Sequence, residues 1–188
     1  GRNSKSNAAG AVAIGKDNSS NNIRAVAIGE QNTAQDADTI AMGYKNKAKT
    51  GGIAIGSGNT TDSTANGGRA ANNGQIAIGQ DNSATNEDTI AIGRGTTASG
   101  RLATAIGRNA DAIGVGSIAF GSNGEPDAHG VAYRTTSKGL GAVAIGMGAG
   151  ADGRAAVALG GMSKAEADGA TAISYGAKSL SKKSVAIG

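Results

Sequence analysis

Branched hydrophobic residues recur along this 188-residue chain in the short pattern Val-Ala-Ile-Gly, most often every 14 residues. Eight of the eleven steps between successive pattern glycines are 14 residues long, and the others are 13, 23 and 25. A fixed repeat of this kind predicts a solenoid, in which each turn contacts its neighbours and all turns share one continuous core. The glycine slots, with Ser174 filling one more, are Gly15, Gly29, Gly43, Gly56, Gly79, Gly93, Gly107, Gly121, Gly146, Gly160 and Gly188.

Each pattern predicts a β-strand of four or five residues, because large side chains alternate with alanine up to a glycine. A helix is disfavoured, since no apolar stripe of period 3.6 lasts from one glycine to the next. The outer face of a solvated strand is usually polar. We assign the alanine of the motif to this face, so both faces are apolar and we expect the strand to be buried on both sides. One face would line the coil and the other would contact a second copy of the chain. The large residues expected in this core or at this contact are Val12, Ile14, Val26, Ile28, Ile40, Ile53, Ile55, Ile76, Ile78, Ile90, Ile92, Ile106, Ile118, Phe120, Val143, Ile145, Val157, Leu159, Ile173, Val185 and Ile187.

A second, shorter strand is predicted in each repeat. Five residues beyond the regular slots lies a small residue with polar neighbours, as at Ser20, Ala34 and Ala84, which suits an inward-pointing position. Asparagine recurs three residues beyond five of the slots, and we assign it to the turn between the strands because it tolerates left-handed backbone angles. The slot glycines suit a turn for the same reason. Two strands and two turns then form one rung of a flattened coil with two parallel sheets.

Composition narrows the class of protein. Aromatic residues are 2% of the chain and glycine accounts for 33 residues, so a globule built on aromatic anchors is excluded. Disorder is the competing interpretation of such a composition, but a disordered chain has no reason to keep apolar residues in phase. The absence of cysteine excludes disulfides, zinc–thiolate sites and cysteine nucleophiles. Because alanine buries little area, we expect a homo-oligomer with the motif strand facing its symmetry axis.

The net charge of +4 comes from basic residues scattered singly between apolar segments. Nucleic-acid binding usually needs a clustered basic stripe and stacking aromatics, so we expect no nucleic-acid partner. Affinity for anionic glycans or a membrane surface is the alternative to plain solvation of these charges. No apolar run has the length of a membrane span. The chain begins and ends inside the repeat, so we expect a fragment whose export signal and membrane anchor lie outside it.

Four segments carry a resemblance to a known family. Ala11–Gly15, Ser117–Gly121, Ala142–Gly146 and Ser184–Gly188 each combine a small residue, a branched residue, alanine, a large apolar residue and glycine. Together with the period, this resembles the head of YadA-type trimeric autotransporter adhesins over essentially residues 1–188. The resemblance implies an all-β, left-handed parallel β-roll assembled as a parallel homotrimer. It also implies display on a Gram-negative outer membrane and attachment to host extracellular matrix or host cells.

Departures from the repeat identify weaker turns and two insertions. Thr104 and Thr171 occupy a valine position, and Ser174 occupies a glycine slot, so we expect these rungs to be weaker or locally distorted. The steps of 23 and 25 residues carry extra residues that must leave the roll as loops, within 57–75 and 122–142.

The second insertion holds the candidate partner-binding residues, because insertions in solenoids map to one face and that face often binds. A metal site is an alternative, since a Glu-x-Asp-x-His cluster supplies suitable ligand types, and a plain structural loop is another. We predict no bound metal and no cofactor. The candidate residues are Glu125, Asp127, His129, Tyr133, Arg134 and Lys138.

The remaining motifs indicate no catalysis. Residues 148–153 spell a dinucleotide-binding fingerprint, but no helix follows whose N-terminus would hold a pyrophosphate. The carboxylates are scattered and do not converge as an active site requires, so we predict that the chain is not an enzyme. A passive spacer that holds another binding domain away from the cell, and a polysaccharide-acting β-helix enzyme, are the alternatives to an adhesin.

Overall fold

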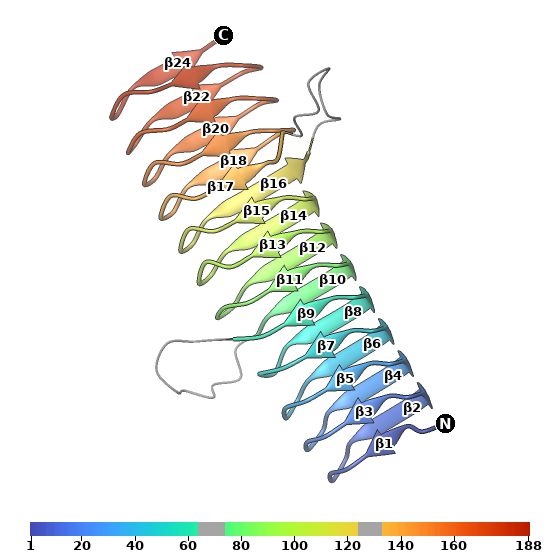
Figure 1. The fold of residues 1–188 in the computed structure, drawn as a ribbon. Helices are drawn as coiled ribbons and strands as arrows, with labels where there is room; N and C mark the ends of the chain where they lie inside the picture. Colours follow the sequence, from blue (N-terminus) through green and yellow to red (C-terminus); the bar gives the residue numbers. More distant parts are fainter. Residues whose placement is uncertain (64–73, 124–132) are drawn as a thin grey trace. The chain divides into compact units, whose positions relative to one another are not determined.

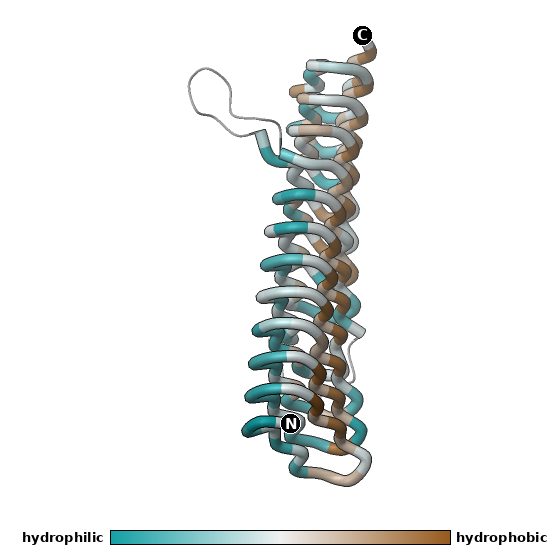
Figure 2. Tube along the Cα trace, turned by 90° about the vertical axis from the view of Figure 1, so that its right-hand side faces the viewer, coloured by the Kyte–Doolittle hydropathy of each residue, from teal (hydrophilic) through white to brown (hydrophobic). Residues whose placement is uncertain are grey.

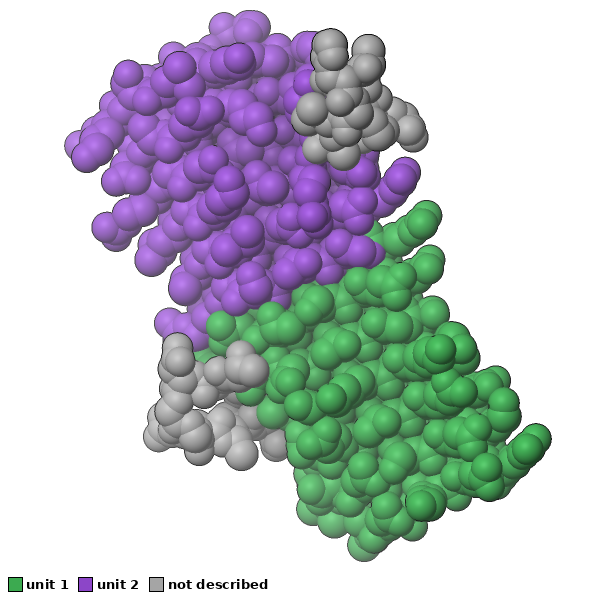
Figure 3. All heavy atoms as spheres, viewed as in Figure 1, with its two compact units in different colours: residues 1–94 green, residues 95–188 purple. Residues whose placement is uncertain are grey.

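The computed structural model describes residues 1–63, 74–123 and 133–188. The chain divides into two compact units, Gly1–Arg94 and Gly95–Gly188 (Figure 3). Within the described residues every regular element is a β-strand. The predicted all-β class is therefore confirmed.

In the first unit the strands alternate between two parallel sheets, one of longer and one of shorter strands (Figure 1). We call these the motif sheet and the short-strand sheet. The motif sheet contains β2 (Val12–Lys16), β4 (Val26–Glu30), β6 (Ile40–Tyr44), β8 (Ile53–Ser57), β10 (Ile76–Gln80) and β12 (Ile90–Arg94). The short-strand sheet contains β1 (Lys5–Ser6), β3 (Ser19–Ser20), β5 (Thr33–Ala34), β7 (Lys47–Ala48), β9 (Thr60–Thr61) and β11 (Ser83–Ala84).

The second unit repeats this arrangement (Figure 1). Its motif sheet contains β14 (Thr104–Arg108), β16 (Ile118–Ser122), β18 (Val143–Ile145), β20 (Val157–Leu159), β22 (Thr171–Ile173) and β24 (Val185–Ile187). Its short-strand sheet contains β13 (Thr97–Ala98), β15 (Asp111–Ala112), β17 (Thr136–Ser137), β19 (Gly150–Ala151), β21 (Lys164–Ala165) and β23 (Lys178–Ser179).

Strand pairing follows the sequence repeat. Each strand pairs in parallel with the equivalent strand one turn later, so that Val12 lies beside Val26 and Ile14 beside Ile28. The register also survives the irregular step of 23 residues, where Gly56 pairs with Gly79. These pairings confirm a parallel β-solenoid with two strands per turn.

The interior of the coil differs from the expectation. Alanine was assigned to the outer face of the motif strand, and this is wrong: Ala27 and Ala41 are fully buried, whereas Ile14 is 57% exposed. All the buried hydrophobic side chains of the described residues are alanines. The space between the two sheets is therefore filled by very small side chains, and the large branched ones point outward. Figure 2 shows hydrophobic residues along one side of the coil in each unit.

The turns also differ in part from the expectation. The slot glycines do adopt positive φ, as at Gly15 (113°), with Gly121 as the exception. The asparagines three residues beyond the slots do not: the second positive φ falls on the residue before them, as at Asp17 (54°). The asparagine side chain of each turn is instead buried inside the coil, as for Asn32.

The substituted rungs keep their geometry. Thr104 pairs with Ile118, and Thr171 pairs with Val157, both in register. Ser174 adopts a φ of 102°, close to that of the glycines it replaces. The local distortion expected at these three positions is therefore not found.

Both insertions lie between a strand of one sheet and the next strand of the coil. The first falls between β9 and β10, and the second between β16 and β17. Each is inside the range expected from the long steps. Of the candidate binding residues, Glu125, Asp127 and His129 lie outside the described residues, whereas Tyr133, Arg134 and Lys138 lie within them.

Candidate assembly surface

The outward face of each motif sheet is an apolar strip, which we call the branched strip. Each turn contributes two side chains to it, from the first and third residues of its motif strand. In the first unit these are Val12, Ile14, Val26, Ile28, Ile40, Met42, Ile53, Ile55, Ile76, Ile78, Ile90 and Ile92. In the second unit they are Thr104, Ile106, Ile118, Phe120, Val143, Ile145, Val157, Leu159, Thr171, Ile173, Val185 and Ile187.

None of the strip side chains is buried in a single copy of the chain. Phe120 is 51% exposed, and Ile78 in the first unit is 36% exposed. Because the register is parallel, equivalent side chains stack about 4.8 Å apart and shield each other's flanks but not their outer faces. No titratable residue interrupts the strip in either unit. Soluble monomers rarely expose a continuous apolar surface of this kind, so the strip has the character of a protein contact.

The slot glycines fix how closely successive turns approach. A Cβ atom added to Gly29 would lie 2.1 Å from the carbonyl oxygen of Gly43 in the next turn. The same contact recurs between Gly79 and Gly93, at 2.0 Å. Together with the positive φ, this contact favours glycine at this position, and Ser174 is the one other residue that occupies it, with a φ of 102°.

Directly inside this edge lies a column of stacked asparagine side chains, the asparagine ladder, which is confined to the first unit. In each step the amide oxygen of one asparagine accepts from the next, as where Asn32 donates both its backbone N–H and its Nδ2 to Asn18 Oδ1 at 3.0 Å. Asn32 Nδ2 also donates to the carbonyls of Ile28 (3.0 Å) and Gly43 (2.6 Å). The side chains thereby supply donors to backbone carbonyls at the turn. The ladder consists of Asn18, Asn32, Asn46, Asn59 and Asn82.

The second unit fills the same position with small residues. Thr135 Oγ1 donates to the carbonyls of Ser122 (3.0 Å) and Gly146 (2.7 Å), and Ser163 Oγ donates to Gly160 (2.9 Å). Ala149 and Ala177 carry no hydrogen-bonding side chain there. The two units therefore share a backbone geometry that different side chains support.

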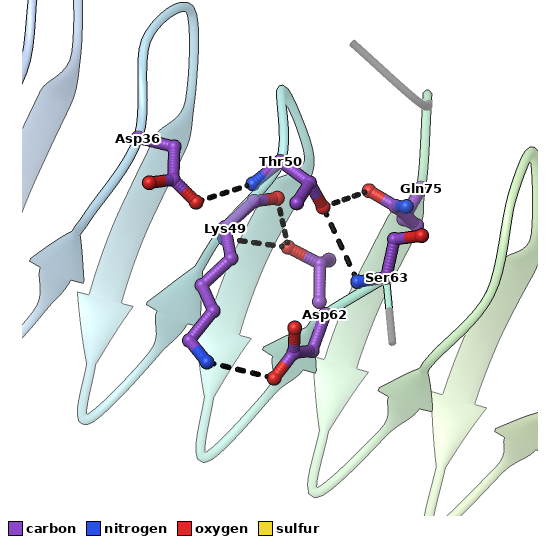
Figure 4. Close-up of polar contacts among 7 residues, drawn as sticks. Asp36, Lys49, Thr50, Asp62, Ser63 and Gln75 are labelled. Carbon is purple, nitrogen blue, oxygen red and sulfur yellow. Dashed lines mark hydrogen bonds and ion pairs between the residues drawn. The ribbon is translucent and has the colours of Figure 1, made fainter. Parts of the chain in front are cut away.

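Polar contacts brace the first unit beside its insertion (Figure 4). Thr50 donates its backbone N–H to Asp36 (2.9 Å) and its hydroxyl to Gln75 Oε1 (3.1 Å). Lys49 forms an ion pair with Asp62 at 2.8 Å. Ser63, the last described residue before the gap, donates its N–H to Thr50 at 3.3 Å. These contacts tie three successive turns together where the repeat is interrupted.

Opposite charges on adjacent turns form ion pairs on the surface of the coil. Lys16 pairs with Glu30 at 2.8 Å, and Arg24 binds both carboxylate oxygens of Asp38. The hydrogen bond from Arg24 lowers the pKa of Asp38, and the same bond raises the pKa of Arg24. Exposed pairs of this kind contribute little to stability.

Two of the predicted binding residues take part in such pairs. Arg134 Nη2 lies 2.9 Å from Asp111, and Lys138 lies 3.3 Å from Asp152. Burial raises the pKa of the Asp111 carboxyl, while the charge of Arg134 opposes that rise. These two cations are therefore held against neighbouring turns of the coil.

Tyr133 takes a different place, in a hollow of about 380 Å³ on the second unit. The other side chains around it include Tyr175, Lys164 and Lys178, none of which was singled out from the sequence. Lys164 lies in one turn of the coil and Tyr175 and Lys178 in the next, so no local motif indicated the three together. The available signal was the period, because Lys164 and Lys178 stand 14 residues apart.

Among residues 1–63, 74–123 and 133–188, no group of three or more His, Cys, Asp or Glu side chains could hold a metal ion. The Glu-x-Asp-x-His cluster considered for a metal lies in the gap between these ranges. The same ranges contain no helix with the length and apolar character needed to cross a membrane.

Comparison with protein families gives one match. The family model of the YadA head domain repeat matches two copies, over residues 20–46, 76–96, 98–123 and 151–173, which together make up just over half of the chain. The matched segments fall in both units. A search of curated proteins finds no match.

Proposed function

The chain belongs to the YadA head domain family, and from this premise we propose that three parallel copies assemble into an adhesin head that attaches to host extracellular matrix or host cells. The family is one of adhesin head domains and not a family of enzymes. Membership supports the number of copies, the left-handed roll and the display on a Gram-negative outer membrane, with the anchor outside this chain.

The exposure of the branched strip is the observation that supports the proposed assembly. The side chains of the strip are uncharged and, apart from Thr104 and Thr171, large and apolar, yet each copy leaves them partly open to solvent. Another copy of the same strip is a suitable cover, because it presents equivalent side chains at the same spacing of about 4.8 Å per turn. Burial of this strip would add the apolar area that the alanine interior lacks.

The proposed assembly leaves the short-strand sheets and the turns exposed for attachment. These surfaces present polar and charged side chains in register, turn after turn. Three copies offer each surface three times, so weak contacts with an extended partner add up to a high avidity. A deep pocket is not required for attachment of this kind.

Assembly is tested by analytical ultracentrifugation of the wild type and of two variants. The wild type should sediment as three times the 18.1 kDa chain. Ile92→Asp places a carboxylate in the proposed contact, so it should shift the protein to smaller species, because a buried unpaired charge is very costly. Ile23→Asp is the matched control, since Ile23 is 41% exposed and lies outside the strip. A monomeric wild type, or an Ile92→Asp variant that keeps the size of the wild type, would contradict the proposal.

Attachment is tested by surface plasmon resonance of the assembled wild type on collagen, laminin and fibronectin, and by its retention on cultured host cells. We expect a response on at least one surface. A trimer that binds none of them would refute the attachment function and favour a passive spacer.

A further inference from the structure

The hollow around Tyr133 is built from side chains of several turns of the second unit. Lys164 and Lys178 begin the strands β21 and β23, and Glu166 directly follows β21. Met162 and Tyr175 lie in the turns that precede these strands. The hollow thus lies at the corner where motif strands turn into the short-strand sheet. We call it the tyrosine–lysine hollow, and its lining includes Tyr133, Met162, Lys164, Glu166, Tyr175 and Lys178.

Glycines make room for the large side chains at this corner. A Cβ atom on Gly150 would lie 2.7 Å from Lys164 Nζ, and one on Gly161 would lie 3.1 Å from the ring of Tyr175. Gly150 is the first residue of β19, a position that holds threonine or lysine in β5, β7 and β17. The lysine side chain therefore occupies space that other turns fill with their own side chains.

Aromatic side chains gather here in a chain that has very few of them. The sequence contains three tyrosines and one phenylalanine, and two of the tyrosines line this hollow. Tyr175 is 69% exposed, with its hydroxyl 3.6 Å from the sulfur of Met162. An exposed tyrosine offers an apolar ring face together with a polar hydroxyl, which suits a ligand that has both kinds of surface.

Two lysines from successive turns line the hollow. The Cα positions of Lys164 and Lys178 are paired in the register of β21 and β23, so two like-charged side chains come from adjacent strands, and Lys164 Nζ extends back over Gly150 of the preceding turn. Such a pair is unfavourable unless an anion lies between the charges. Within the described residues neither lysine forms an ion pair, whereas Lys16, Lys49 and Lys138 each do. This arrangement leaves both ammonium groups available to an external anion.

We propose that the tyrosine–lysine hollow binds an anionic sugar residue of a glycan. The apolar face of the pyranose ring would lie against Tyr175 and Tyr133, and its carboxylate or sulfate would lie between Lys164 and Lys178. Glu166 would accept hydrogen bonds from the sugar hydroxyls. The inference rests on the proposed function only in taking the short-strand sheet to face outward in the assembly. It adds a ligand class and a defined site to the attachment function.

The experiment measures binding of three oligosaccharides to the assembled protein by isothermal titration calorimetry. A heparin hexasaccharide carries sulfates and carboxylates, a hyaluronan hexasaccharide carries carboxylates alone, and a chitin hexasaccharide is neutral. We expect binding of at least one anionic probe and no measurable binding of the neutral one. The two anionic probes distinguish a preference for sulfate from one for carboxylate. The affinity should fall with added salt, because the charges are near the surface.

Matched variants assign the binding to the hollow. Lys178→Gln and Tyr175→Ala should each weaken binding by about tenfold or more, as loss of a charge-assisted bond or of an aromatic contact implies. Lys47→Gln is the control, because Lys47 is exposed and begins β7 as Lys178 begins β23. It should leave the affinity within about twofold of the wild type. Circular dichroism and sedimentation of each variant show that the fold and the assembly are retained.

Three results would overturn the inference: no binding of either anionic probe, equal binding of the neutral probe, or equal weakening by Lys47→Gln and Lys178→Gln. These results are distinct from failure of the proposed function. A trimer that adheres to matrix or cells but binds no oligosaccharide removes the glycan site and leaves the adhesin. A protein that binds the anionic probe but neither trimerises nor adheres keeps the site and removes the proposed function.

Discussion

Replacing Asn46 with alanine removes one step from the middle of the asparagine ladder. Asn46 is 1% exposed and lies between Asn32 and Asn59 in the column. Alanine fits the backbone at this point, since Ala149 and Ala177 occupy equivalent positions in the second unit. The substitution therefore removes hydrogen bonds without introducing a steric conflict.

The expected loss follows from the contacts of one side chain. Asn46 Nδ2 donates to the carbonyls of Gly56 (2.7 Å) and Met42 (2.9 Å) and to Asn32 Oδ1 (3.0 Å). Its Oδ1 accepts from the N–H and from the Nδ2 of Asn59, both at 3.0 Å. Each bond contributes about 1 kcal/mol net, and the two amide hydrogens are shared among three acceptors. Regained side-chain entropy offsets about 1 kcal/mol, so the free energy of unfolding should fall by about 3 kcal/mol.

Urea unfolding followed by circular dichroism measures this change, at a fixed protomer concentration because assembly adds to the apparent stability. Asn21→Ala is the control: Asn21 is exposed and accepts from Asn7 at 3.0 Å and from Ser19 at 2.6 Å. It should change the free energy of unfolding by less than about 1 kcal/mol. Equal effects of the two substitutions would refute the argument that the ladder stabilises the turns through buried bonds.

Two further predictions concern the second unit. Gly107→Ala should lower the free energy of unfolding by about 3 kcal/mol or more, because its Cβ would clash with the carbonyl of Gly121. Gly116→Ala should cost only about 1 kcal/mol, since Gly116 has a φ of 64° and an added Cβ meets no atom within 4 Å; equal losses in urea unfolding would contradict the steric explanation. Burial raises the pKa of Asp111, so the folded chain holds its proton more tightly than the unfolded chain does. Its contribution to stability is therefore present at low pH and is lost as the pH rises through the raised pKa. Asp111→Asn should therefore reduce the decline in the free energy of unfolding that is measured from pH 3 to pH 6. An unchanged pH dependence in this variant would contradict the role assigned to Asp111.

The repeat length was sufficient to predict the strand pairing. Equivalent residues such as Ile76 and Ile90 stand 14 residues apart and pair directly, because a coil of constant turn length brings each residue beside its equivalent. The slot glycines were predicted for a related reason. A residue such as Gly79 follows the alternating part of its strand, and its φ of 122° is one that glycine alone adopts without strain.

Which face of the motif strand points into the coil could not be predicted in the same way. Alternation shows that the two faces of a strand differ, but not which face points inward. In β12 the more hydrophobic Ile90 and Ile92 point outward, and Ala91 is fully buried. Packing decides the orientation, because the interior positions of both sheets hold small side chains, such as Ala84 and Ala91.

The asparagines do lie in the turns between the strands, as Asn18 lies between β2 and β3, but the reason assigned to them was wrong, because the positive φ falls on the preceding residue. A turn can be formed by any of several residue types. Here asparagine itself recurs at one fixed position of the repeat, and Asn18 and Asn32 bond to each other. Recurrence of one amide at one position in five turns is the signal that could have indicated a buried ladder. The tyrosine–lysine hollow was missed because its residues come from turns that no local motif connects.

An interior of alanine links the folding of this chain to its assembly. Alanine loses no side-chain entropy on burial but also buries little apolar area, so a single coil gains little from its own core. In the proposed assembly another copy removes the larger side chains, such as Ile28 and Ile55, from water. Once the motif sheets are covered in this way, the surface left for ligands is the short-strand sheet and the corners beside it. The tyrosine–lysine hollow lies at such a corner, so a trimer would carry it three times. A glycan long enough to reach two hollows would then bind more tightly than a single sugar residue. Several weak contacts would in this way add up to attachment.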